Sequence, residues 1–317
     1  MSSEDYTPKK IANAIQRLEK SKLSEQNITD LKELRRSYEL EEKSGHTIAS
    51  LFSCFLRMSD LIDFDLRDAE KEQLKDLVLK INRNNHEDYS GYSAHTRADD
   101  RQALQAFYSW LEGEEGPEIC DFFRCKVRPN EEVKIDPEEL IGVEEAEKLI
   151  DACMNARDRC MLGILWDSGM RTKEIMALKW KDIIVEEDGM MKVHVRNGKN
   201  GPRKIYLYEC VPLVSNWLDE YPSPEPEDPL WVDLRYPEKK KGIGKRALAK
   251  QVAEARKRIQ LPQRKKTNPH AWRKARATEM AARGMNIPAA NKFFGWARGS
   301  DVFKRYIWLA ETDLENT

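Results

Sequence analysis

The sequence predicts a mainly α-helical chain with a small antiparallel β-sheet, of the α+β class, arranged as two domains. Apolar residues recur at the helical period over residues 1–115 and again in the last third of the chain. Between these regions, the turns Asp188-Gly189 and Asn197–Gly201 separate three short segments in which apolar and polar residues alternate. A length of 317 residues is enough for two domains with ample cores.

Residues 1–125 are predicted to form a helical domain, and they contain no pattern typical of catalysis. Thr96 is the expected N-cap of the last helix in this domain, and Gly113 is expected to end it. The following segment, 126–140, loses the helical period and carries Pro129 and Pro137 among charged residues, which predicts a linker. The helices are expected over residues 8–20, 24–44, 46–62, 68–83 and 94–112.

Residues 141–317 are predicted to form the second domain. Helices are expected over 143–154, 156–168, 173–178, 211–220 and 245–259, and strands over 182–187, 190–196 and 203–208. Thr172 is the expected cap of the short third helix. Three further helices are expected, one from Pro269 to before Gly284, one from Pro288 to before Gly295, and one that Ser300 caps.

Charge is distributed unevenly, although the formal net charge is only −1. Residues 239–306 hold 20 Lys and Arg against 3 Asp and Glu, whereas residues 1–238 hold 34 against 49. A segment this basic within a near-neutral chain indicates a face that binds a polyanion, and a merely solvated basic face is the alternative.

Composition also bears on compartment and cofactors. The first residues resemble neither a signal peptide nor a transit peptide, and no apolar run is long enough to span a membrane, so a cytoplasmic, nucleoid-associated protein is expected. Cys120 and Cys125 are the half of a zinc site at most, because no matching His or Cys pair follows. Buried free thiols are the preferred interpretation of the six cysteines. We predict no cofactor and no metal.

The stretch from His270 to Tyr306 carries the strongest functional pattern. His270 and Arg273 lie one turn apart on one face of a predicted helix, near a start that Pro269 marks. The free N–H groups and positive dipole end of a helix start favour a phosphate. Trp296 and then Tyr306 follow from the next two helices, so a guanidinium, an imidazole, an indole and a phenol can converge. This combination predicts a phosphate site with a nucleophile.

These residues resemble the C-terminal signature of the tyrosine recombinases, or phage-type integrases: H-x-x-R, then Gly-His or Gly-Trp, then a Tyr about ten residues on. The resemblance extends upstream to a G-x-R-x-x-E pattern at Gly169, Arg171 and Glu174. It implies a helical core-binding domain followed by a tyrosine-recombinase catalytic domain. The sequence departs from many members by having Trp296 where they have His, and GWARGSDVFKRY resembles archaeal integrase-like members, which suggests an archaeal or viral mobile element.

The resemblance assigns a role to each of six catalytic residues. Arg171 and Arg273 would neutralise the phosphate, Tyr306 would attack it, and His270 would accept or share the tyrosyl proton. Trp296 would donate its indole N–H to a phosphate oxygen. A Lys on the second hairpin turn protonates the leaving oxygen in the family, and Lys199 occupies that turn. Lys204, within the third strand, is the second choice.

The predicted function is therefore site-specific DNA recombination or integration through a 3′-phosphotyrosine intermediate, without metal or ATP. The expected partner is double-stranded DNA, bound by a tetramer of protomers that are monomeric or weakly associated without it. Two alternatives remain: a type IB topoisomerase-like nicking-closing enzyme, and a non-catalytic DNA-binding protein on a recombinase scaffold. The acidic tail after Tyr306 resembles the segment that docks on a neighbouring protomer in the family, with Ile307, Trp308 and Leu309 as docking candidates.

Overall fold

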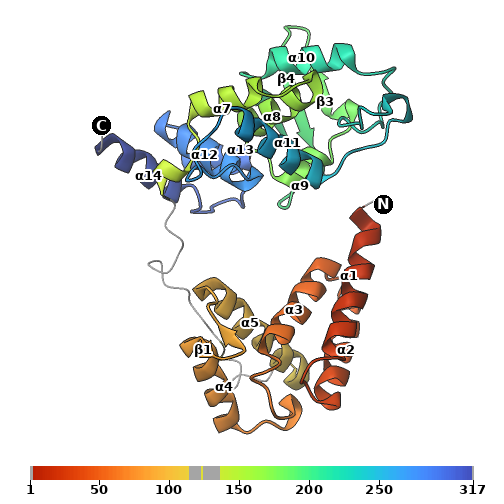
Figure 1. Cartoon of the computed structure of the whole chain (residues 1–317), viewed down its shortest axis with the longest axis vertical. Helices are drawn as coiled ribbons and strands as arrows, with labels where there is room; N and C mark the ends of the chain where they lie inside the picture. The colour runs from red at the N-terminus through yellow and green to blue at the C-terminus, as the bar shows by residue number, and fades with distance from the viewer. Residues whose placement is uncertain (1–2, 114–122, 124–135, 316–317) are drawn as a thin grey trace. The chain divides into compact units, whose positions relative to one another are not determined.

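The computed structural model describes residues 3–113, 123 and 136–315, and the chain divides into two compact units, Met1–Lys134 and Ile135–Thr317 (Figure 1). Cys120, Cys125 and most of the predicted linker 126–140 lie outside the described residues. Pro137–Glu139 form a short 3-10 helix, and the Glu139 carbonyl accepts a hydrogen bond of 2.7 Å from the backbone N–H of Lys266 in the second unit. The predicted domain boundaries of residues 1–125 and 141–317 stay a prediction.

The first unit is helical, as the periodicity predicts. Its core is aromatic, with Phe52, Phe55 and Phe107 buried together. Ser93, rather than the predicted Thr96, caps the last helix, because the Ser93 hydroxyl accepts the Thr96 backbone N–H. The elements are α1 (Ser3–Leu18), α2 (Glu25–Leu40), α3 (Gly45–Met58), η1 (Leu66–Asp68), α4 (Lys71–Arg83), the short hairpin β1 (Asn85–His86) and β2 (Tyr89–Ser90), which was not predicted, and α5 (Ala94–Glu112).

The second unit is built around one helix, α8, in which every residue except Arg159 is buried. It packs against α7, α10 and α12, and against the sheet through β5. The sheet is antiparallel in the order β3-β4-β5, and the alternating residues Val193, Val195 and Ile205 are buried on one face. The elements are α7 (Val143–Asp151), α8 (Ala156–Ser168), α9 (Thr172–Met176), β3 (Ile183–Val185), β4 (Met191–Val195), β5 (Arg203–Leu207), α10 (Val211–Glu220) and α11 (Lys245–Arg258).

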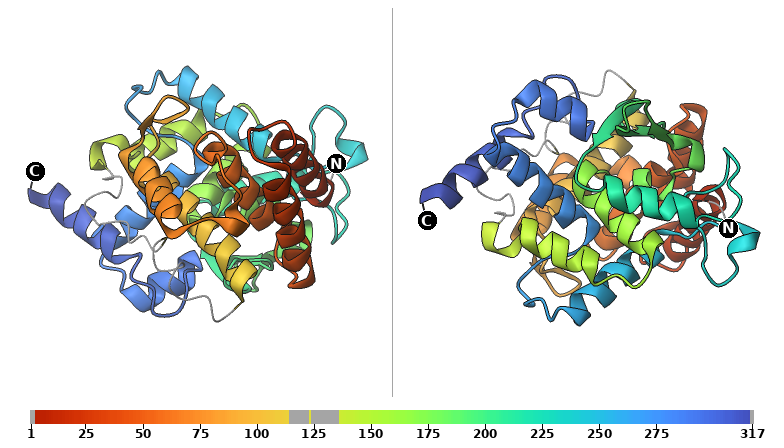
Figure 2. Two further views of the ribbon diagram at one scale, coloured as in Figure 1. Left: turned by 90° about the horizontal axis from the view of Figure 1, so that it is seen from below. Right: turned by 90° about the horizontal axis from the view of Figure 1, so that it is seen from above.

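Three helices complete the second unit: α12 (Pro269–Ala282), α13 (Ile287–Phe294) and α14 (Lys304–Glu315). Phe294, Phe303, Tyr306 and Leu309 form a small core between them. Both views of Figure 2 show α14 extending from the rest of its unit to the C-terminal end. Among the described residues, no helix is both long enough and apolar enough to cross a bilayer.

Three local predictions for the second unit are wrong. Thr172 is the first residue of α9, and Arg171 occupies the cap because the Glu174 carboxylate reaches back to its N–H. Ser300 does not cap α14, which starts at Lys304; its hydroxyl accepts the Val302 N–H in a local turn instead. Leu309 is not free to dock on another protomer, because it is buried in the core of its own unit, whereas Trp308 is 61% exposed.

Candidate active site

Arg171 is placed by the abrupt end of α8. Gly169 ends that helix in the left-handed region, with φ of 54°, and a Cβ at this position would lie 2.5 Å from a ring carbon of Phe294. The chain therefore turns tightly against the end of α13 before α9 begins. The Arg171 guanidinium donates to Glu174 at 2.9 Å and to the Gly295 carbonyl at 3.2 Å. The Glu174 carboxylate and the Gly295 carbonyl together hold the Arg171 guanidinium in place.

Arg273 spans the same two helix ends from α12. Its guanidinium donates to the carbonyl of Gly169 at 2.8 Å and to that of Phe294 at 2.6 Å. Carbonyls at a helix C-terminus lack intrahelical partners and carry the negative end of the dipole, so they hold a cation well. These bonds use two of the five N–H donors, which leaves three for another acceptor. Burial, and the nearby charge of Arg171, lower the pKa of Arg273 to about 10, so it stays charged at neutral pH.

His270 lies in the first turn of α12, where the Asn268 side chain caps the helix by accepting the Ala271 N–H. Partial burial of its ring, followed by the positive charges of Lys274, Arg273 and Arg171, lowers the pKa of His270 below its ordinary value. The imidazole is therefore neutral at pH 7, the form that can accept a proton.

Trp296 and Tyr306 continue the cluster. The Arg273 guanidinium carbon lies 5.1 Å from the centre of the Trp296 ring. The Trp296 ring is stacked on that of Tyr306, with centroids 5.8 Å apart and planes at 10°. Tyr306 is buried, which raises the pKa of its hydroxyl, while the charges of Arg273 and Arg305 act in the opposite direction. At neutral pH the phenol is protonated, so its use as a nucleophile requires a base.

Lys199 is the one predicted catalytic residue that stands apart. Its side chain is exposed on the turn between β4 and β5, and among the described residues no hydrogen bond or ion pair of its side chain joins it to the other five. The turn itself reaches the cluster, since the Asn200 side chain donates to the Gly295 carbonyl at 3.1 Å. That oxygen therefore accepts from both Asn200 and Arg171. Lys204 lies exposed on β5, in register with His194.

Arg203 belongs to the cluster, although the sequence reasoning overlooked it. It starts β5, and its guanidinium makes a two-pronged ion pair with Glu174, at 3.1 and 2.8 Å. Its Nε donates to the Phe293 carbonyl at 3.0 Å. The available signal was the strand alternation, which places Arg203 on the buried face with Ile205 and Leu207.

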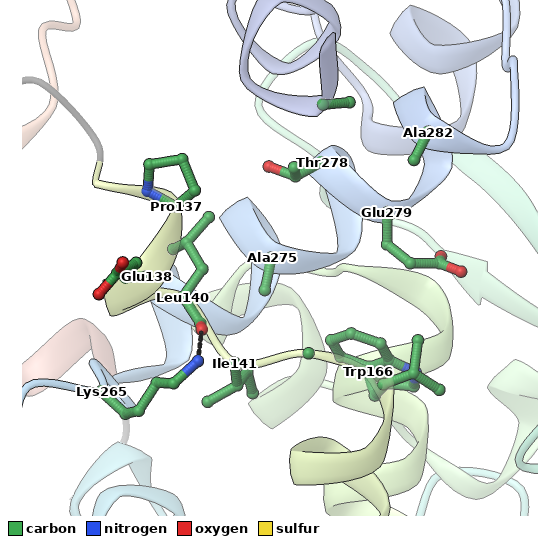
Figure 3. Close-up of a pocket in the computed structure, with 13 residues that line it drawn as sticks. Pro137, Glu138, Leu140, Ile141, Trp166, Lys265, Ala275, Thr278, Glu279 and Ala282 are labelled. Carbon is green, nitrogen blue, oxygen red and sulfur yellow. Dashed lines mark hydrogen bonds between the residues drawn. The ribbon is translucent and has the colours of Figure 1, made fainter. Parts of the chain in front are cut away.

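One cavity among the described residues lies away from this cluster. It has a volume of about 490 Å³ and contains none of the six predicted catalytic residues. Figure 3 shows Ala275, Thr278 and Glu279 of α12 facing it, opposite Leu140, whose carbonyl accepts a 2.7 Å hydrogen bond from Lys265. Among the described residues, no group of three or more His, Cys, Asp or Glu side chains is arranged to hold a metal ion, and the four described cysteines are free and buried.

Residues 139–312 match the sequence profile of the phage integrase family. Because that match covers more than half of the chain, the chain belongs to the phage integrase family.

Individual relatives agree with this assignment. The chain is similar to tyrosine recombinase XerA of Saccharolobus solfataricus, with 26% identity over 216 residues, which are 68% of this chain and 63% of that protein. It is similar to tyrosine recombinase XerA of Pyrococcus horikoshii, with 26% identity over 277 residues and 86% of each chain. Transposase A from transposon Tn554 of Staphylococcus aureus is 22% identical over 184 residues, 54% of this chain and 49% of that protein. The first of these relatives and the transposase are thus matched over less than two thirds of their own length.

Solved structures share the fold. The XerH site-specific recombinase bound to palindromic difH substrate, in a post-cleavage complex, aligns with a TM-score of 0.65 and 18% identity over 98% of this chain and 88% of that chain. A lambda integrase tetramer bound to a Holliday junction aligns with a TM-score of 0.62 and 14% identity over 86% and 77%. These likenesses confirm the predicted fold class, mainly α with a small antiparallel sheet.

Proposed function

We propose that this chain is a site-specific DNA recombinase or integrase that breaks and rejoins strands through a phosphotyrosine at Tyr306. One observation supports this most strongly. Arg171 donates to the Gly295 carbonyl and Arg273 to the adjacent Phe294 carbonyl, both at the end of α13, and the Trp296 ring contacts both Arg273 and Tyr306. Transfer of a phosphodiester to tyrosine requires positive charge on the phosphate oxygens and a nearby phenol, and the two guanidinium groups and Tyr306 supply these.

The proposed reaction has two mirrored steps. The Tyr306 oxygen attacks a DNA phosphorus and forms a phosphotyrosine at the 3′ side, while the bond from phosphorus to the 5′ oxygen breaks. The tyrosyl proton passes to His270, and the leaving 5′ oxygen takes a proton from Lys199. A 5′ hydroxyl of a second strand then attacks the phosphotyrosine and reverses these transfers. The six residues proposed as catalytic are Arg171, Lys199, His270, Arg273, Trp296 and Tyr306.

Double-stranded DNA is the proposed partner, and two observations support it. The segment 239–306, with 20 Lys and Arg against 3 Asp and Glu, contains α11, α12 and α13, and many of its basic side chains are exposed. The structural neighbours XerH and lambda integrase are bound to DNA. Such a basic face binds the DNA backbone with a strong dependence on salt.

A tetramer on two DNA sites is the proposed assembly, with protomers monomeric or weakly associated before DNA binds. The neighbouring lambda integrase is a tetramer on a Holliday junction. In this chain, Trp308 on α14 is 61% exposed, and we assign it as a contact to another protomer. A nucleoid-associated location in the cytoplasm follows from the proposed DNA partner.

Nicked suicide DNA substrates from the genome around the gene provide the test. On such a substrate the leaving strand is lost after cleavage, so the phosphotyrosine cannot be reversed and a covalent complex accumulates on a denaturing gel. A complex supports the proposal, and its absence on every substrate, with DNA binding retained, indicates the non-catalytic alternative. Strand exchange between two duplexes distinguishes a recombinase from a nicking-closing enzyme, which only relaxes supercoiled plasmid.

A further inference from the structure

Glu174 is the most completely hydrogen-bonded carboxylate near the proposed phosphate site. Its Oε1 accepts from the Arg171 guanidinium at 2.9 Å and from Arg203 at 3.1 Å. Its Oε2 accepts from the Arg171 backbone N–H at 2.9 Å and from Arg203 at 2.8 Å. Two of the four donors thus belong to Arg203, and the Glu174 side chain is only 3% exposed.

Arg203 has no direct route to a DNA phosphate. Its side chain is 7% exposed, two of its nitrogens face Glu174, and its Nε faces the Phe293 carbonyl. A Cβ at Gly295 would lie 2.7 Å from an Arg203 nitrogen, so the guanidinium fills the space under the peptide to which Arg171 donates. Arg203 therefore contacts Glu174 and the Gly295 peptide, the two groups that hold Arg171, without contacting the proposed phosphate site itself.

The contact between Arg203 and Glu174 also sets the charge balance around Arg171. Arg171, Arg203 and Arg273 with Glu174 carry a net charge of +2, and the loss of Arg203 would reduce it to +1. Arg171 would then be the sole guanidinium bonded to Glu174, and a buried carboxylate that loses a partner binds the remaining one more strongly. The Arg171 charge would be neutralised by Glu174 and drawn towards it, away from a phosphate.

We propose that Arg203 is a positioning residue with two roles. It holds the Glu174 carboxylate where that carboxylate orients Arg171, and its positive charge offsets the negative charge of Glu174. This inference rests on the proposed function, because Arg171 is assigned there to the phosphate. Arg203 thereby connects the strand that follows the Lys199 turn to the arginine that binds the phosphate. Its effect is on the rate of cleavage, and not on DNA affinity.

The test compares single-turnover formation of the covalent complex, at saturating suicide DNA, between the wild-type chain and variants. Arg203→Met should slow cleavage by about 10²-fold, the scale expected for a displaced catalytic group. DNA affinity, measured in a Tyr306→Phe background, should change less than about twofold, because most of the affinity comes from other phosphate contacts. Arg203→Lys keeps the charge without the fork and should fall between Arg203→Met and wild type.

The decisive comparison adds Glu174→Gln. Alone, Glu174→Gln should slow cleavage, because its amide N–H₂ faces guanidinium donors. In the Arg203→Met background, Glu174→Gln should instead speed cleavage about tenfold or more. It restores the net charge of +2 and leaves an amide oxygen as acceptor for Arg171. The loss of one charged donor slows a reaction by at least about that factor. A structural role alone would not reverse the sign of the Glu174→Gln effect on the rate at saturating DNA.

Arg157→Met is the matched stability control. Arg157 and Asp158 form another buried ion pair in the same unit, with side chains 7% and 2% exposed. This variant should lower the thermal stability as Arg203→Met does, yet cleave at the wild-type rate at temperatures where it is folded. If Arg203→Met does not fold, Arg203→Lys carries the comparison, and a wild-type rate for it overturns the inference.

The outcomes distinguish failure of the proposed function from failure of the positioning role of Arg203. No covalent complex from the wild-type chain overturns the proposed function and the inference with it. A complex from wild type, with Arg203→Met equally fast or with the double variant slower than Arg203→Met, overturns the inference alone.

Discussion

The rings of Trp296 and Tyr306 lie nearly parallel, with centroids 5.8 Å apart, and Arg273 lies against the Trp296 ring. An indole at this position therefore supports the proposed nucleophile by stacking. From the sequence, Trp296 is expected only to donate a hydrogen bond to a phosphate oxygen. Stacking explains how a residue that cannot transfer a proton is accommodated where many family members have His.

Tyr306→Phe should abolish the covalent DNA complex while the fold and DNA binding persist. The variant removes only the attacking oxygen and keeps the ring that packs on Trp296 and Phe303. Tyr206→Phe and Tyr108→Phe, an exposed and a buried tyrosine, are the controls and should form the complex normally. A complex formed by Tyr306→Phe would mean that another residue is the nucleophile.

Arg171→Ala and Arg273→Ala should each slow cleavage by on the order of 10²–10³-fold, as expected for the loss of one preorganised charged donor group. Arg171→Lys and Arg273→Lys should cleave faster than the Ala variants but more slowly than wild type. Arg273→Lys should recover least, because one ammonium cannot span the Gly169 and Phe294 carbonyls as the guanidinium does. Single-turnover rates check this, with the exposed Arg298→Ala as control. Weaker DNA binding with normal cleavage would identify these arginines as anchors only.

Lys199→Ala should cleave ordinary DNA slowly and a 5′-bridging phosphorothiolate almost as fast as wild type. A 5′ oxygen leaves poorly unless it is protonated, whereas a thiolate leaves without a proton. Lys204→Ala, made alongside, should affect both substrates little, because its side chain belongs to β5 and not to the turn that Asn200 attaches at Gly295. Thiolate rescue of Lys204→Ala in place of Lys199→Ala would transfer the acid to the strand.

His270 should remain neutral at pH values where an ordinary histidine is half protonated. Burial and the neighbouring positive charges lower the pKa of His270, so the midpoint of its titration lies below the unperturbed value of about 6.5 in the DNA-free protein. NMR titration of the imidazole signals measures this, and His270→Gln identifies the resonance. Lys274→Met removes one of the charges that lower the pKa and should therefore move the titration to higher pH. An unshifted His270 would remove the argument for a neutral base.

Much of the fold was predictable because its determinants are local. Asn268 and Pro269 start α12, and the Asp188-Gly189 turn joins two strands, by chemistry that acts within a few residues. The errors at Thr96, Thr172 and Ser300 share one cause. In each case the helix starts at another residue than predicted, since Ser93 caps α5, Arg171 occupies the cap of α9 and α14 starts at Lys304. Sequence alone does not show which of several neighbouring residues begins a helix.

The sequence pattern predicts most residues of the candidate site but not the hydrogen bonds that link them. The motif places His270 and Arg273 one turn apart, but nothing local indicates that Arg273 would bridge the ends of α8 and α13. Arg203 was missed because a charged residue on a strand is usually solvated, and its partner Glu174 lies 29 residues earlier in the chain. Long-range pairing of this kind depends on the packed fold.

The Gly295 carbonyl oxygen accepts hydrogen bonds from both Arg171 and Asn200, so one peptide group holds the proposed phosphate-binding side chain and the lysine-bearing turn together. A rotation of that peptide would weaken both hydrogen bonds at once. If the proposed covalent joining to DNA takes place, the shared carbonyl couples the placement of the proposed phosphate-binding arginine, used in cleavage and in resealing, to that of the lysine-bearing turn. A protomer with half of its site assembled, able to nick a chromosome but not to repair the nick, is thereby disfavoured.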